Sequence, residues 1–102
     1  MILLLLLMWH YLSDFALQND FVATYKAKQV NGEYNPMWYH VLFAHCMIHS
    51  LGVLIITQNI YLTMFMLVTH FIIDYTKCER KITFNIDQLL HIVVICIIAT
   101  LN

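Results

Sequence analysis

The sequence predicts an all-α integral membrane protein in which four transmembrane helices form a bundle with short loops. Hydrophobic residues make up 62% of the 102 residues and charged residues only 11%, whereas soluble domains average about half and about a quarter. Two glycines and one proline leave little room for long loops. Four apolar segments of about 16–21 residues follow one another, close to the roughly 20 residues that cross a bilayer as a helix.

We expect these segments to form one domain that spans the whole chain. The first lacks the basic start and the small-residue cleavage pattern of a signal peptide, so it is expected to be a retained helix. In the polar connection that follows, Phe21–Gln29 is expected to form a short interfacial helix, and Asn31-Gly32 is typical of a turn. A tight connection around Gln58 separates the second and third segments. The expected helices cover residues 2–19, 37–57, 60–75 and 84–101.

The positive charges are confined to two connections. All five Lys and Arg residues lie within residues 20–36 or 76–83, and an up-down bundle places these two connections on the same side of the membrane. By the positive-inside rule that side is cytoplasmic, so the multi-pass chain is expected to have both termini outside. The net charge of −1 and the lack of a basic face argue against a nucleic-acid partner.

Each apolar segment carries one pair of ionisable side chains four residues apart. On a helix, both members of such a pair project from the same face, one turn apart. Counted from the polar connections at about 1.5 Å per residue, nearly all of them lie within about 20 Å of the cytoplasmic surface. Since ionisable groups are costly within a bilayer, this convergence predicts one buried polar site that opens to the cytoplasm. The pairs are His10–Asp14, His45–His49, His70–Asp74 and Asp87–His91.

Imidazole and carboxylate groups are the ligands that zinc, manganese and iron use in proteins. Eight such groups exceed the roughly four ligands of one zinc ion, so either two metals bind or some groups orient the ligands of one. The first functional hypothesis is a membrane-embedded, metal-dependent hydrolase that acts on a lipid or a phosphoester. In it Asp87, as a carboxylate not bound to metal, is the general base. The metal ligands would be His10, Asp14, His70 and Asp74, helped by His45, His49, Asp87 and His91.

The pairs also have interpretations without a metal. His–Asp pairs can join helices through hydrogen bonds, and a chain of them can pass protons or ions. The second functional hypothesis is therefore a non-enzymatic, oligomeric membrane protein, either a channel or a phage-encoded modulator of a host membrane component. Its partners would be the lipid bilayer and either further copies of the chain or a host membrane protein. His40 is expected at a polar rim, and Cys46, Cys78 and Cys96 are expected to be small apolar residues.

Four sequence blocks around these pairs resemble, in their order along the chain, a family of small bacterial and phage membrane proteins known as domain of unknown function 3307. The resemblance implies a bacterial or phage origin and a location in the bacterial inner membrane. More distantly, the pattern is similar to that of membrane-bound, metal-dependent hydrolases with helices rich in His and Asp. The blocks are His10–Gln18, which continues to Lys26, then His45–Ser50, His70–Lys77 and Asp87–His91.

Overall fold

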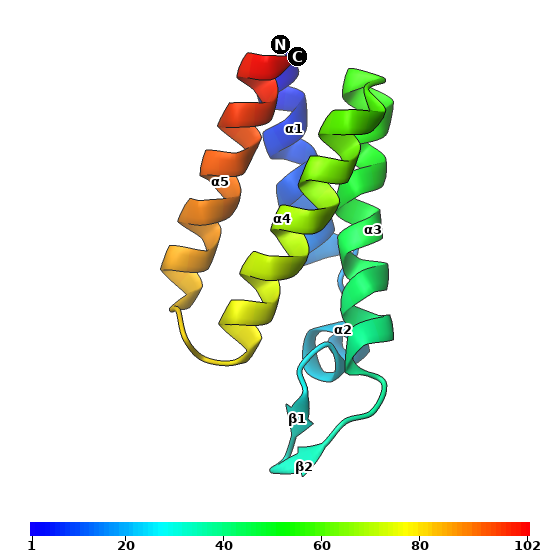
Figure 1. Cartoon of the computed structure of the whole chain (residues 1–102), viewed down its shortest axis with the longest axis vertical. Coiled ribbons are helices and arrows are strands. Elements are labelled where there is room, and N and C mark those ends of the chain that lie inside the picture. The colour runs from blue at the N-terminus through cyan, green and yellow to red at the C-terminus, as the bar shows by residue number, and fades with distance from the viewer.

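The computed structural model describes residues 1–102, which form five α-helices, one π-helical turn and a short hairpin. Helix α1 contacts α3 and α5, and α4 contacts the same two helices, so these four lie side by side (Figure 1). Helix α2 and the hairpin lie at one end, opposite both termini. The expected all-α class is confirmed. The elements are α1 (Ile2–Tyr11), the π-helical turn η1 (Leu12–Ala16), α2 (Asp20–Tyr25), β1 (Gln29–Val30), β2 (Glu33–Tyr34), α3 (Trp38–Thr57), α4 (Ile60–Cys78) and α5 (Phe84–Leu101).

Side-chain caps begin α4 and α5, and a left-handed residue ends α3. Helix α3 ends where Gln58 takes a left-handed conformation with φ 53°. The side-chain oxygen of Asn59 then accepts a hydrogen bond from the Tyr61 N–H at 2.9 Å and starts α4, and Thr83 starts α5 in the same way. Helix α4 continues three residues beyond the expected end, to Cys78, because the polar residues there still complete a helical turn.

The first segment is divided, whereas the sequence predicts one helix over residues 2–19. After α1, the Leu17 N–H donates to the Leu12 carbonyl oxygen at 2.9 Å, which is the five-residue spacing of a π-helical turn. Asn19 then adopts an extended backbone, and its side chain accepts from the Val22 N–H at 2.9 Å. This side-chain cap separates α2 from the first helix.

The connection between α2 and α3 folds back as a small hairpin. Asn31 and Gly32 both have positive φ angles, 54° and 79°, which a two-residue hairpin turn requires. Asn35 ties the hairpin to α2, since its amide nitrogen donates to the carbonyl oxygen of Tyr25 at 2.7 Å. The short helix expected over Phe21–Gln29 is present but ends at Tyr25.

Helices α1 and α3 approach each other closely at Gly52. A Cβ atom at this position would overlap the indole ring of Trp9. The same indole donates from Nε1 to the carbonyl oxygen of Ile48 at 3.0 Å. Trp9 therefore packs directly on the backbone of α3, and only glycine leaves room for it.

The interior is layered along the bundle. The end that holds both termini has an apolar core, and the ionisable pairs lie closer to α2 and the hairpin. Each of the four bundle helices contributes to the apolar layer and to the polar layer. Apolar side chains therefore fill the bundle on the side of the polar layer that faces the termini. The apolar core consists of Leu6, Val53, Leu62, Met66, Val94, Ile95 and Ile98.

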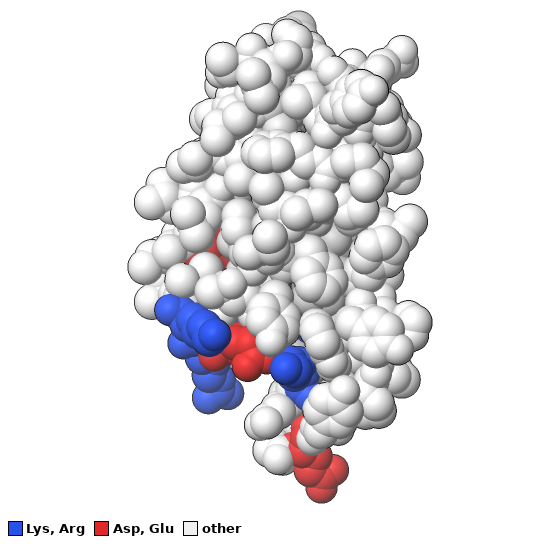
Figure 2. Space-filling view, viewed as in Figure 1, with Lys and Arg blue, Asp and Glu red and all other residues white.

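The protein buries more polar than hydrophobic residues, which is the reverse of the distribution in soluble proteins. Twelve polar or charged residues are buried against nine hydrophobic ones, while 32 large hydrophobic residues are exposed. Figure 2 shows that most of the Lys, Arg, Asp and Glu atoms on this face gather at the end that carries α2 and the hairpin, and that the face is otherwise almost entirely uncharged.

Two of the four bundle helices, α3 and α5, are long and apolar enough to cross a membrane by length and composition. The expectation of four such helices is thus met only in part. Helix α1 is shorter, and α4 carries His70, Asp74 and Lys77 in its second half. Only 44% of the apolar stretch of α3 and 28% of that of α5 is buried, so both helices turn most of their surface outward.

Candidate metal centre

All eight predicted side chains point into the space between the four bundle helices. Seven of their residues are buried, with exposed fractions of 3% or less, and Asp14 is partly buried. The i,i+4 spacing is what turns both members of each pair inward. Helices α1 with η1, α3, α4 and α5 each supply one pair, namely His10 and Asp14, His45 and His49, His70 and Asp74, and Asp87 and His91.

Five imidazole rings lie in contact with one another. His70 is at the centre, with its ring stacked on His49 at a centroid distance of 3.8 Å and on His91 at 4.2 Å. His10 lies 5.3 Å from both His49 and His91, and His45 lies 5.3 Å from His70. The packing brings five imidazoles, a common type of metal ligand, into one place.

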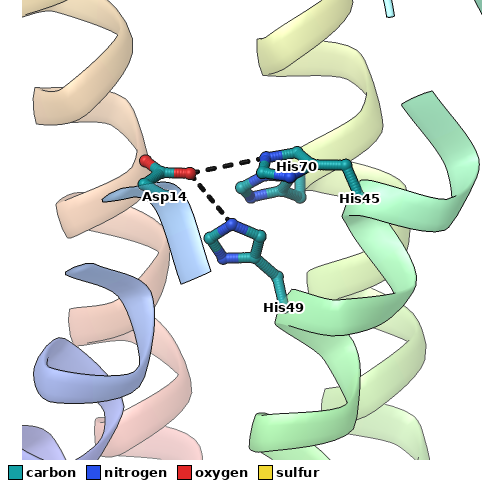
Figure 3. A group of neighbouring side chains, drawn as sticks. All are labelled: Asp14, His45, His49 and His70. Carbon is teal, nitrogen blue, oxygen red and sulfur yellow. Dashed lines mark hydrogen bonds and ion pairs between the residues drawn. The ribbon is translucent and has the colours of Figure 1, made fainter. Parts of the chain in front are cut away.

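Asp14 is the carboxylate on which this group converges. Its Oδ1 lies 2.9 Å from Nε2 of His49 and 3.4 Å from Nε2 of His45 (Figure 3). Its Oδ2 lies 3.4 Å from Nε2 of His10 and accepts a hydrogen bond from Nε2 of Gln88 at 3.0 Å. The π-helical turn η1 carries Asp14, so a local irregularity of the first segment sets the position of the central ligand.

Four of the side chains have the composition and spacing of a metal site. Asp14, His45, His49 and His70 each offer one donor atom within 4.8 Å of all the others. For comparison, ligands bonded at about 2.0–2.1 Å to a tetrahedral zinc lie about 3.3 Å apart. Nε2 of His45 and both ring nitrogens of His70 are buried without a hydrogen-bond partner. Buried polar atoms normally have a hydrogen-bond partner. Ring nitrogens without one therefore fit ligands of a divalent transition metal.

The structure divides the predicted ligands differently from the sequence analysis. His45 and His49, expected as helpers, belong to the group of four around Asp14, whereas His10 and Asp74 lie beside it. Asp74 is held instead by two ammonium groups, at 2.9 Å from Lys26 and 3.5 Å from Lys77. The pairing with Lys77 follows from the helical spacing.

Lys26 is a site residue that sequence reasoning missed. Its side chain is only 4% exposed, and Nζ donates to Asp74 Oδ2 at 2.9 Å and to Gln18 Oε1 at 2.7 Å. Asp74 Oδ2 in turn lies 3.6 Å from Nε2 of His45, so Lys26 is linked to the centre through one carboxylate. The family resemblance includes Lys26 in its first block, but helical spacing gives Lys26 no role, because the path of the connection decides which lysine turns inward.

Asp87 and His91 form the side of the cluster that lies on α5. Asp87 Oδ1 is 3.2 Å from Nε2 of His91 but has no hydrogen-bond partner, while its Oδ2 accepts from Nε2 of Gln88 at 3.2 Å. Gln88 is a second residue whose role was not predicted. Its amide contacts Asp14, Asp87 and His10, the last at 3.0 Å.

Only a small part of the cluster is exposed at the surface of the protein. The side chain of Asp14 is 12% exposed, whereas those of His10, His45, His49 and His91 are at most 3% exposed. Figure 2 shows acidic atoms recessed among uncharged ones above the charged end, so a carboxylate can be seen from outside. His40 lies apart from the cluster, exposed and with its ring 4.2 Å from that of Tyr39.

The family comparison agrees with the sequence blocks around the polar pairs. A family model described as a protein of unknown function (DUF3307) matches residues 2–102, which include all four pairs. No curated protein and no solved structure matches the chain. The match covers nearly the whole sequence, and the chain therefore belongs to the DUF3307 family of proteins of unknown function.

Proposed function

We propose that this chain is a multi-pass protein of the bacterial inner membrane that binds a divalent transition metal between its helices and uses it to hydrolyse a lipid or a phosphoester. The observation that carries the proposal is the buried group of Asp14 with three imidazoles, in which three ring nitrogens lack a partner. The family match adds no activity, so the proposal rests on this site.

The membrane part is supported by the reversed distribution of side chains. A soluble protein with 32 exposed large hydrophobic residues and a polar interior would present far too much apolar surface to water. In a bilayer that surface is in contact with lipid instead. The 20 residues of α3 span about 30 Å, the thickness of the hydrocarbon core. The shorter α1 with η1 would span with local thinning of the bilayer.

The orientation is supported by the charged end. Four of the five Lys and Arg residues lie in the connections at the end that carries α2 and the hairpin, the fifth, Lys77, lies in the last turn of α4, and both termini lie at the other end. The positive-inside rule therefore favours a cytoplasmic position for the charged end. The ionisable cluster would then lie nearer the cytoplasmic surface, where the headgroup of a lipid or a water-soluble phosphoester could reach it.

The chemistry follows from the donor set. Asp14, His45, His49 and His70 would hold the ion, and a divalent metal at such a site activates water and polarises a phosphoryl or acyl oxygen. Asp87, whose Oδ1 lies 3.2 Å from Nε2 of His91 without a hydrogen bond, is proposed to accept the proton as general base. Asp74, bound by Lys26 and Lys77, stays outside the ligand set.

Metal analysis of the detergent-purified protein tests the proposal. We expect at least one zinc, manganese or iron ion per chain by mass spectrometry, and we expect loss of that ion in Asp14→Asn and in His70→Ala. The matched control is His40→Ala, which removes an exposed histidine and is expected to retain the ion. A phosphodiester lipid analogue then tests catalysis, with turnover expected to fall at least about 100-fold in Asp87→Asn.

A well-folded wild-type protein that holds no metal after growth in metal-replete medium would rule out the proposal. The second candidate would then be a proton relay, which is favoured by a chain of close contacts from Lys26 to Asp74, His45 and Asp14 at 2.9, 3.6 and 3.4 Å. A continuous pore through one chain finds less support, because the apolar core closes the end near the termini.

A further inference from the structure

The two oxygens of Asp14 face different sets of donors. Oδ1 faces His45 and His49, as the dashed lines in Figure 3 show, and the other oxygen points away from that group. Oδ2 lies 3.4 Å from Nε2 of His10 and 3.0 Å from the amide nitrogen of Gln88. A carboxylate placed in this way can bridge two ions, one bound to each oxygen.

The amide of Gln88 lies where a second cation would bind. Its nitrogen donates to Asp14 Oδ2 at 3.0 Å and to Asp87 Oδ2 at 3.2 Å, and its oxygen lies 3.0 Å from His10 Nε2. Two buried carboxylates thus share the partial positive charge of a single neutral amide. A cation in the same place would compensate their charge far better.

A second, independent observation concerns atoms that the amide leaves without partners. Asp87 Oδ1 and His10 Nδ1 are buried and form no hydrogen bond. Both residues are 2% exposed or less, so bulk water does not form hydrogen bonds with these atoms. Asp87 and His10 therefore each contact Gln88 through one polar atom and keep their other polar atom without a hydrogen bond.

We infer that His10, Asp14 and Asp87 form a second divalent-cation site, which shares Asp14 with the first and opens when Gln88 swings away. The inference rests on the proposed function, because Asp14 bridges to the first ion. Gln88 is only partly buried and has a long side chain, so its amide can leave without a movement of α5. With an ion on Asp87 Oδ2, Oδ1 would still face Nε2 of His91.

The donor atoms indicate which ion this second site prefers. Two carboxylate oxygens and one imidazole form a harder ligand set than the one carboxylate and three imidazoles of the first site. Carboxylate-rich sites suit manganese and magnesium, whereas imidazole-rich sites suit zinc. We therefore assign Mn²⁺ to the second site as the ion to be used in its test.

Manganese titration of the metal-depleted, full-length protein in detergent tests the inference. We expect two Mn²⁺ per chain with a spin-coupled electron paramagnetic resonance signal, and one uncoupled ion in Asp87→Asn. In Gln88→Ala the second ion is expected to bind about tenfold more tightly, because the three hydrogen bonds of the amide no longer have to be broken. The matched control is Gln29→Ala, an exposed glutamine of β1 that lies outside the cluster and is expected to leave both affinities unchanged.

The outcomes separate this inference from the proposed function. One ion per chain in the wild type, unchanged in Gln88→Ala, would overturn the second site and leave the proposed function standing. Two ions without spin coupling would place the second ion elsewhere and also overturn it. No bound ion at all would overturn both. If Asp87→Asn fails to fold, the affinity change in Gln88→Ala still decides the question.

Discussion

Lys26 is a buried ammonium group that two hydrogen bonds hold within the polar cluster. It binds Asp74 and Gln18 at 2.9 and 2.7 Å, although it comes from the connection after α2 and not from a bundle helix. Buried lysines are rare unless they are paired. The contact therefore fixes α2 and the hairpin against the bundle at the side of the proposed metal centre.

Replacement of Lys26 tests the strength of this contact. Lys26→Met leaves Asp74 buried with Lys77 as its remaining cation, 3.5 Å away. We expect the free energy of unfolding to fall by about 3 kcal/mol, the usual effect of removing one partner of a buried ion pair. Denaturant unfolding in detergent measures it, and Lys26→Met combined with Asp74→Asn is expected to recover part of the loss.

Lys28 provides the matched control two residues away. It donates to the hydroxyl of Tyr75 at 3.4 Å, and this bond raises its pKa, so the ammonium stays charged at neutral pH. Lys28→Met is expected to leave the unfolding midpoint unchanged. Equal effects of the two substitutions would contradict a special role for Lys26.

At the residue scale, spacing in the sequence was sufficient to choose the eight cluster residues but not their partners. The i,i+4 rule determines which side chains share a face, and so it selected His45, His49 and His70. Contacts between helices depend on their rotation and on the path of the connection. Those two quantities decide that Lys26 binds Asp74 and that Gln88 links Asp14 to Asp87.

At the scale of elements, the approach of α1 to α3 depends on one glycine. The Trp9 ring occupies the space that a side chain at Gly52 would need, and Trp9 also donates to the Ile48 carbonyl oxygen. Gly52→Ala is expected to push the two helices apart and to destabilise the protein by about 1–3 kcal/mol, as overpacking usually does. Thermal unfolding followed by circular dichroism in detergent measures this change.

The neighbouring exposed residue Leu51 serves as control, because Leu51→Ala alters the outer surface of the same helix without touching Trp9. We expect its unfolding temperature to match that of the wild type. A double-mutant cycle with Trp9→Ala should show that the penalty of Gly52→Ala depends on the indole. A Gly52→Ala variant as stable as the wild type would refute the steric argument.

The ends of the elements differ in how well composition predicts them. Apolar runs bounded by Asn59 and Thr83 place the starts of α4 and α5, since both residues act as side-chain caps. The break in the first segment was not foreseen. The π-helical turn over Leu12–Ala16 has no distinct sequence signal, whereas Asn19, the cap of α2, lies where the first segment was expected to end.

At the scale of the whole molecule, the charged end and the end with both termini are expected on opposite sides of the membrane. In a background with Cys46→Ala, Cys78→Ala and Cys96→Ala, we expect Glu33→Cys in the hairpin to react with an impermeant maleimide only in inverted vesicles. Asn102→Cys at the other end is expected to react from outside intact spheroplasts.

Each of these two variants is the control for the other, because both thiols lie at exposed positions. Labelling of both thiols from the same side would contradict a chain that crosses the bilayer with four helices. Labelling with the sides exchanged would contradict the positive-inside assignment and would place the polar cluster near the outer surface.

The unpartnered atoms inside the bundle have a consequence for the life of the protein in a cell. Six buried side-chain atoms lack partners, and each such atom lowers stability by about 1–3 kcal/mol. An ion that binds them shifts the equilibrium toward the folded chain in proportion to its availability. Under metal starvation the chain would open more often to membrane proteases, so its abundance would follow the supply of its ion.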